Sequence, residues 1–158
     1  MGKHSDTLKR LFDQWQGGKN DNLEEYMKLL SEDIEYDHFL HPTLAQEAGI
    51  FYLTHKKGKE AVRQMHQRLQ GPKASVPAAE PAVGMAFERY KILRWYESED
   101  TVFLLVDIKA LVHDTGKTYE DQHLLEYVFN EEGKVCRFRH WLDTGKHIES
   151  NSKDYINT

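Results

Sequence analysis

The chain has 158 residues, of which 39% are hydrophobic and 11% aromatic, and its formal net charge at pH 7 is −5. This length allows one domain with a substantial hydrophobic core and leaves no room for two ordinary domains, so we expect a single domain over residues 1–158. The acidic balance argues against a nucleic-acid-binding surface, and no apolar run approaches the roughly 20 residues that span a bilayer. We therefore expect a soluble protein without a nucleic-acid or membrane partner.

The first residues lack the apolar segment of a secretory signal, which favours a cytoplasmic protein. The sequence contains one cysteine, Cys136, so an internal disulfide is excluded, and no second cysteine provides a metal-ligand spacing. We interpret Cys136 as a small residue of the core.

Two short helices are predicted at the start of the chain. An apolar stripe from Leu8 to Trp15 follows the 3.6-residue period, with Ser5 placed as the N-cap and Gly17-Gly18 as the end. A second stripe over residues 23–30 follows almost at once. The two helices should pack as a hairpin.

A strand is predicted directly after the second helix, because the pattern changes to alternation. Ile34, Tyr36 and His38 then share one face of this strand. Residues 40–57 have no clear period and contain several aromatic side chains, including Tyr52. Such a long loop inside a compact domain is usually functional, and we expect it to be a lid or a binding wall.

A third helix is predicted between Gly58 and Gly71, where Val62 and His66 belong to one apolar stripe. His66 should therefore face the core. The Pro- and Ala-rich residues 73–84 are typical of an extended connection within the domain.

The remaining sequence predicts long strands separated by short turns, at residues 85–96, 101–112, 117–129 and 134–142. These turns make neighbouring strands antiparallel. Helices followed by long antiparallel strands constitute an α+β fold, in which a strongly curved sheet wraps around three N-terminal helices and encloses a pocket.

Histidine and aspartate side chains on these strands are candidates for proton transfer. Phe138, His140 and Leu142 share one face of the last strand, and His140 would transfer protons if that face lines a closed cavity. Both faces of the strand over residues 101–112 are apolar. Asp107 on that strand either orients a histidine in the pocket or forms an ion pair with a nearby cation.

The order of these elements resembles that of the nuclear-transport-factor-2-like (NTF2-like) superfamily, in its SnoaL-like and ketosteroid-isomerase-like branch. Two motifs carry the resemblance, G-K-E-A-V at residues 58–62 and G-K-V-C-R-F-R-H-W-L-D at residues 133–143. It implies a cone-shaped, cystatin-like α+β roll with a core over about residues 6–149 and a flexible tail at residues 150–158. It also implies a small, mostly apolar ligand in the open end of the cone.

This superfamily includes isomerases, polyketide cyclases, dehydratases, epoxide hydrolases and non-catalytic association domains. Our leading hypothesis is an acid–base enzyme that acts without a cofactor on a small hydrophobic carbonyl or polycyclic substrate, with His38, His140 and Asp107 as catalytic residues. The resemblance to steroid isomerases implies a catalytic base from the first strand, and His38 or Asp37 is nearest to that position. One alternative is a non-catalytic ligand-binding or association domain. A second is an epoxide- or ester-hydrolase-like activity, although the resemblance places His140 where such epoxide hydrolases carry an aspartate.

The predicted pocket also has a set of candidate substrate-binding residues, which are Trp15, Tyr36, Tyr52, His66, His123, Tyr127 and Phe138. We expect no metal site, because the nine histidines include no tight ligand spacing. The opposite face of the last strand carries Arg137, Arg139 and Trp141, and the resemblance implies a homodimer through this outer face.

Overall fold

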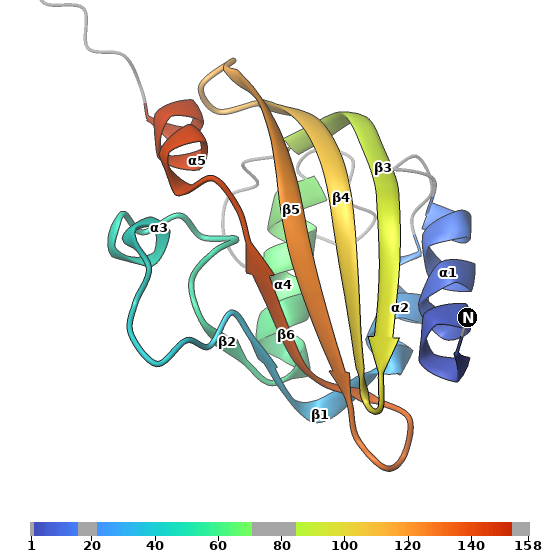
Figure 1. Cartoon of the computed structure of the whole chain (residues 1–158). Helices are drawn as coiled ribbons and strands as arrows, with labels where there is room; N and C mark the ends of the chain where they lie inside the picture. Colours follow the sequence, from blue (N-terminus) through green and yellow to red (C-terminus); the bar gives the residue numbers. More distant parts are fainter. Residues whose placement is uncertain (1, 16–21, 71–84, 153–158) are drawn as a thin grey trace, which may run out of the picture.

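The computed structural model describes residues 2–15, 22–70 and 85–152 and shows an α+β fold (Figure 1). The elements in chain order are α1 (Lys3–Trp15), α2 (Leu23–Leu29), β1 (Leu30–Tyr36), α3 (Leu44–Glu47), β2 (Lys56–Lys57), α4 (Lys59–Gln70), β3 (Met85–Ser98), β4 (Thr101–Val112), β5 (Thr118–Phe129), β6 (Val135–Trp141) and α5 (Thr144–Asn151). The predicted helix end at Gly17-Gly18 and the predicted connection at residues 73–84 lie outside the described residues. No helix in the described part of the chain could cross a membrane.

The strands form one mixed sheet in the order β2-β1-β6-β5-β4-β3. The antiparallel pairing of β3 with β4, β4 with β5, and β5 with β6 is confirmed. The prediction of a wholly antiparallel sheet is wrong for β1, which pairs in parallel with β6. No short turn joins these two strands, because most of the chain separates them, so the hairpin rule does not apply to this pair.

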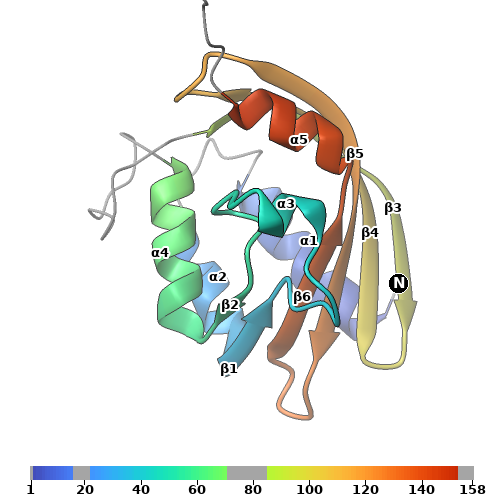
Figure 2. The ribbon, with the colours of Figure 1, turned by 90° about the vertical axis from the view of Figure 1, so that its left-hand side faces the viewer.

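Helices α1, α2 and α4 cover one face of the sheet, and the long strands β3, β4 and β5 bend around them (Figures 1 and 2). Along β4, the buried positions alternate strictly with partly exposed ones. Val102, Leu104 and Val106 are each 0% exposed. Each such side chain contributes about 1.5–3 kcal/mol through burial. This face of β4 therefore forms the core, and the face with Asp107 points away from it.

The first helix is attached to the sheet through Leu8 and Ser5, which are its buried residues. The helix begins at Lys3, so the prediction that Ser5 is its N-cap is wrong. The backbone N–H of Ser5 has no partner within the first turn, and it donates instead to Oε1 of Glu97 on β3 at 2.6 Å. A polar contact thus joins the start of α1 to the end of β3.

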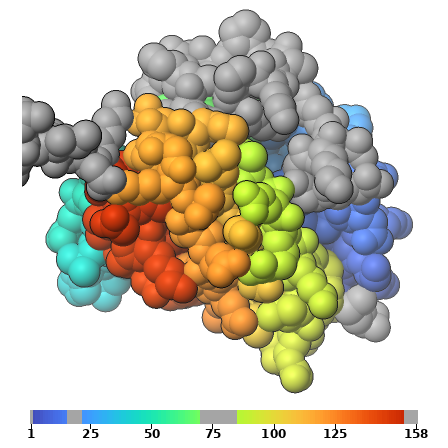
Figure 3. Space-filling view, turned by 90° about the horizontal axis from the view of Figure 1, so that it is seen from above, coloured from blue at the N-terminus to red at the C-terminus, as the bar shows by residue number. Residues whose placement is uncertain are grey.

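The sequence analysis did not predict α5, which follows β6 directly. Asp143 is its N-cap and accepts a hydrogen bond from the backbone N–H of Lys146 at 3.2 Å. Ser150 is 2% exposed within this helix. Seen from above, α5 lies between α3 and the segment around the β4–β5 turn (Figure 3).

The outer face of the sheet carries the side chains that the sequence analysis assigned to a dimer contact. Arg139 donates from Nε to Oε1 of the buried Glu126 at 2.9 Å, and its guanidinium lies 5.2 Å from the centre of the Trp141 ring. Trp141 is 39% exposed. Pairing of two copies through this face stays a prediction.

Candidate functional site

A cavity of about 190 Å³ lies between the sheet and the helices α1, α2 and α4. Aromatic and aliphatic side chains form most of its wall, together with a few polar atoms. The wall includes every residue that the sequence analysis assigned to substrate binding, namely Trp15, Tyr36, Tyr52, His66, His123, Tyr127 and Phe138. It also includes His140. Contact of these residues with a substrate stays a prediction.

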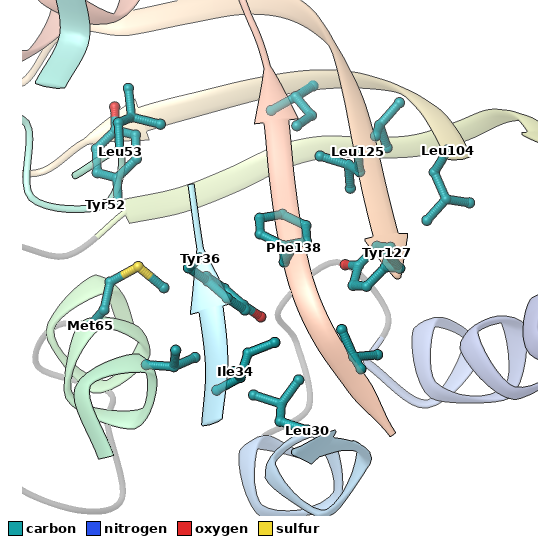
Figure 4. Packing of buried hydrophobic residues seen from close by; sticks show 14 of the residues in the cluster. Leu30, Ile34, Tyr36, Tyr52, Leu53, Met65, Leu104, Leu125, Tyr127 and Phe138 are labelled. Atoms are coloured by element: carbon teal, nitrogen blue, oxygen red, sulfur yellow. The ribbon is translucent and has the colours of Figure 1, made fainter. Parts of the chain in front are cut away.

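Neighbouring strands direct these side chains into one row. Tyr36 on β1, Phe138 on β6 and Tyr127 on β5 lie side by side, and Met65 of α4 faces them (Figure 4). The ring centre of Phe138 is 4.4 Å from that of Tyr36 and 4.9 Å from that of Tyr127. Aromatic pairs at such distances add about 0.5–1.5 kcal/mol each beyond their burial. The three rings therefore pack against one another as one part of the cavity wall.

His140 forms a hydrogen-bonded pair with Asp37, the alternative to His38 at the end of the first predicted strand. Nδ1 of His140 lies 2.7 Å from Oδ1 of Asp37, and the backbone N–H of His140 donates to the same oxygen at 3.0 Å. The two side chains are 12% and 2% exposed. A carboxylate at Nδ1 holds the imidazole in one tautomer and leaves Nε2 free to accept a proton.

Asp37 takes this place because the chain turns at the end of β1. Its φ is 53°, in the left-handed region, so the alternation of the strand ends at Tyr36. Its backbone N–H donates to the carbonyl of Phe138 at 2.8 Å, and its carbonyl accepts from Nε2 of Gln46 at 2.7 Å. These bonds on both sides keep the strained backbone in place.

The prediction that His38 shares a face with Tyr36 and meets His140 is wrong. The turn at Asp37 directs His38 outward, where its side chain is 58% exposed and its Nδ1 lies 2.8 Å from Oε2 of Glu35. Its ring stacks on that of His55 at 4.7 Å. His38 therefore belongs to the surface.

Asp107 also lies away from the cavity. It forms an ion pair with Arg89 on β3, in which Nε of Arg89 is 2.8 Å from Oδ2 of Asp107. The alternation of β4 explains this placement, since Val106 and Ile108 occupy the buried face. Of the two alternatives for Asp107, the structure therefore shows the ion pair with an arginine, and the side chain does not orient a histidine of the cavity.

Tyrosine hydroxyls provide further polar atoms in the cavity wall. The hydroxyls of Tyr26 and Tyr36 are hydrogen-bonded to each other. Burial raises the pKa of Tyr26, and burial together with the nearby Tyr26 raises the pKa of Tyr127 well above its usual value. Both phenols therefore stay protonated near neutral pH and can donate hydrogen bonds to a ligand.

His66 on α4 contributes an uncharged imidazole to the same wall. Burial, with a smaller effect of the nearby His140, lowers the pKa of His66 to about 4. Within the described part of the chain, its buried Nε2 has no hydrogen-bond partner. A ligand with a donor group would satisfy this nitrogen.

Replacing His66 with Leu should flatten the pH dependence of stability between about pH 6.5 and pH 4. The unfolded chain protonates His66 in this window while the folded protein does not, so the free energy of unfolding of the wild type falls as the pH falls. The full effect is at most roughly 3 kcal/mol. Urea denaturation at pH 7 and pH 4.5 measures it, with exposed His41→Leu as the control. If the free energy of unfolding changes equally with pH in both variants, the lowered pKa of His66 would be contradicted.

A second polar cluster lies where β5 meets α5. Nε2 of His123 is 3.1 Å from Nε2 of His147, and Oδ2 of Asp121 is 3.3 Å from the former and 3.4 Å from the latter. Burial lowers the pKa of His123, and it lowers that of His147 to about 3. Burial alone would raise the pKa of Asp121, but bonds from His123 and from backbone N–H groups lower it to about 2.

No family model matches the chain, and no curated protein matches it. Many solved structures do. An NTF2-like protein of unknown function from Burkholderia pseudomallei is 16% identical, with a TM-score of 0.67 over 95% of this chain and 98% of the other. A "putative isomerase" from Rhodopseudomonas palustris is 19% identical, with a TM-score of 0.66 over 95% and 97% of the two chains. A "putative SnoaL-like polyketide cyclase" from Mesorhizobium loti is 17% identical, with a TM-score of 0.61 over 89% and 99%.

These likenesses extend over nearly the whole of each chain. The chain therefore has the fold of the NTF2-like and SnoaL-like proteins, as its final strand and element order predicted. At this level of identity the likeness concerns the fold, and the function has to be argued from the site.

Proposed function

We propose that this protein is an acid–base enzyme of the isomerase or cyclase kind, which moves a proton on a small hydrophobic carbonyl compound. The observation that carries the proposal is the bond of 2.7 Å between Asp37 and Nδ1 of His140, in the wall of a cavity that is otherwise mostly apolar. The names of two similar structures, a "putative isomerase" and a "putative SnoaL-like polyketide cyclase", support the same class.

The proposed step uses Nε2 of His140 as the base. It takes a proton from the carbon next to the substrate carbonyl, and the C–H electrons form a C=C bond while the C=O electrons move to the oxygen. A tyrosine hydroxyl, from Tyr26, Tyr36 or Tyr127, donates a hydrogen bond to this developing oxyanion. If the substrate carries a second C=C bond beyond that carbon, the enolate is a conjugated dienolate. The imidazolium then returns the proton to the far end of this system, the oxyanion electrons re-form the C=O bond, and the C=C bond has moved by one position. Asp37 stabilises the positive charge on His140 during the step.

The apolar wall supports the hydrophobic character of the substrate. Placing a charged enolate in such a site strengthens its hydrogen bonds, because little water competes for them. The positions of His66 and Tyr127 around the cavity provide polar atoms for more than one oxygen of a polycyclic or polyketide-like compound.

Exchange of carbon-bound hydrogen in heavy water tests the proposal without knowledge of the natural substrate. The protein is incubated with small cyclic ketones, fused-ring ketones and aromatic polyketide fragments in D₂O, and NMR records loss of the proton next to the carbonyl. We expect exchange of at least one compound to be faster with protein than without it. Tight binding of a compound whose protons do not exchange would overturn the catalytic proposal.

A non-catalytic binding domain is the second candidate, because the aromatic wall suits ligand binding even without a reaction. In that case His140 would only hydrogen-bond the ligand. An epoxide-hydrolase-like activity has less support, since Asp107 is held by Arg89 outside the cavity and the last strand provides a histidine.

A further inference from the structure

The cluster of Asp121, His123 and His147 has a geometry that the acid–base proposal does not use. Three ligand-type atoms, Oδ2 of Asp121 and Nε2 of each histidine, lie 3.1 to 3.4 Å from one another. Their side chains are 8%, 7% and 0% exposed. A carboxylate and two imidazole nitrogens thus converge on one buried point, next to the cavity that His123 lines.

We propose that these three side chains bind a divalent transition-metal ion of the zinc class. Zinc bound by imidazole and carboxylate at about 2.0–2.2 Å in tetrahedral geometry keeps neighbouring ligand atoms roughly 3.3–3.5 Å apart. The three separations observed here are close to that value. Neutral imidazoles and a carboxylate are also the ligand types that zinc and similar ions accept.

The surrounding hydrogen bonds orient the ligands. Nδ1 of His147 lies 2.9 Å from the hydroxyl of Tyr52, which also accepts a bond from Nδ2 of Asn151 at 2.7 Å. The Asp121 carboxylate is held by the backbone N–H groups of Gln122 and Asp143, each at 2.8 Å. Partners of this kind at the second ring nitrogen and at the carboxylate are typical of metal sites.

In the His147 tautomer that a metal ion requires, with the proton on Nδ1, protons alone satisfy this cluster poorly. A neutral imidazole carries one proton, on Nδ1 or on Nε2. If Tyr52 accepts the Nδ1 proton of His147, the Nε2 lone pair of His147 faces both His123 and the Asp121 carboxylate. One proton, on Nε2 of His123, would then have to serve two acceptor atoms, Nε2 of His147 and Oδ2 of Asp121. A cation at the centre of the three ligand atoms would satisfy all three.

A second group of possible ligands, Glu35, His38 and His55, offers a matched control. It lies at the surface, and Nζ of Lys57 is 4.0 Å from the Glu35 carboxylate. Exposure and the nearby positive charge disfavour a bound cation there. Variants of this group remove histidines without changing the buried cluster.

Zinc binding by the whole chain tests the inference. The protein is stripped of metal with a chelator and titrated with Zn²⁺ by calorimetry, and with Co²⁺ to record the visible absorption of a four-coordinate ion. We expect one ion per chain, with affinity lowered at least about 100-fold in Asp121→Asn and in His147→Gln. Tyr52→Phe should lower it roughly 10-fold, and the double variant His38→Gln/His55→Gln should retain wild-type affinity.

A measurement on the wild type covers the case in which a buried variant does not fold. Long-range ¹H–¹⁵N NMR should show Zn²⁺ shifting Nε2 of His123 and His147 selectively. No binding by the metal-free wild type, or binding that only the His38→Gln/His55→Gln variant loses, would overturn the inference. The acid–base proposal can fail separately, because His140 contributes no ligand and His140→Gln should leave zinc affinity unchanged.

Discussion

Replacing His140 with Gln should lower the rate of proton transfer by about 10²–10⁴-fold, the usual contribution of a positioned general base. Gln fills most of the space of the imidazole but has no nitrogen that can accept a proton at neutral pH. The backbone N–H of residue 140 can still donate to Asp37, so the fold should be preserved. The measurement is the rate of deuterium exchange for the most reactive carbonyl compound, with thermal unfolding as a check.

Two variants outside the cavity provide controls for this result. Asp107→Asn changes an outward ion pair with Arg89, and His38→Gln removes an exposed histidine. Both should keep the wild-type exchange rate. A rate that falls equally in Asp107→Asn and His140→Gln, or an unchanged rate in His140→Gln, would remove His140 from the mechanism. The exchange rate of Asp37→Asn should lie between those of the controls and of His140→Gln. The base remains in this variant, but it loses the negative charge that stabilises its protonated form.

Replacing Leu104 with Ala should lower the free energy of unfolding by about 3–5 kcal/mol. Leu104 is 0% exposed at the centre of β4, so the change removes apolar contacts and leaves a space that the rigid sheet fills poorly. Urea denaturation measures the loss as a shift in midpoint at constant slope.

The matched control is Leu40→Ala, the same substitution at a side chain that is 91% exposed. We expect it to change the free energy of unfolding by no more than about 0.5 kcal/mol. Similar losses in the two variants would show that the β4 face with Leu104 is not the core face.

Alternation along the strands, together with the resemblance that assigned the β5 set to the pocket, predicted part of the cavity wall. His123 and Tyr127 on β5, and Phe138 and His140 on β6, lie inward as expected. Such positions are predictable because a strand fixes the direction of every second side chain. Which face of β4 is buried could not be decided from the pattern, since both faces carry apolar residues. The packing of β4 on the helices decided it.

Of the proposed catalytic pair, the sequence analysis chose His140 and preferred His38 to Asp37. The sequence analysis continued the strand alternation to residue 38. In the structure the strand ends at Tyr36, and Asp37 adopts a left-handed conformation. No glycine marks this turn, and a positive φ is uncommon for any other residue, although aspartate adopts it more often than most. The bonds from Phe138 and Gln46 that hold it come from distant parts of the chain. Local sequence therefore assigned the role to His38.

The role of His147 was missed for a different reason. The helix α5 has a weak apolar stripe, and its start signal is the single N-cap Asp143. Asp121 and His123 do show the two-residue spacing that places both on one face of a strand. The third member of the cluster lies 24 residues beyond His123, on another element. Spacing along the sequence could not reveal it.

The pairing of β1 with β6 has a consequence for the order in which the protein matures. Asp37 and His140 are 103 residues apart, and β1 finds its parallel neighbour only in the strand that comes latest in the sequence. Contacts of such separation form slowly. During synthesis, β1 and its carboxylate exist well before the imidazole that they will hold. A partly synthesised chain can bury its helices, but it lacks the pair of Asp37 and His140. The proposed activity would therefore appear only when β6 pairs with β1.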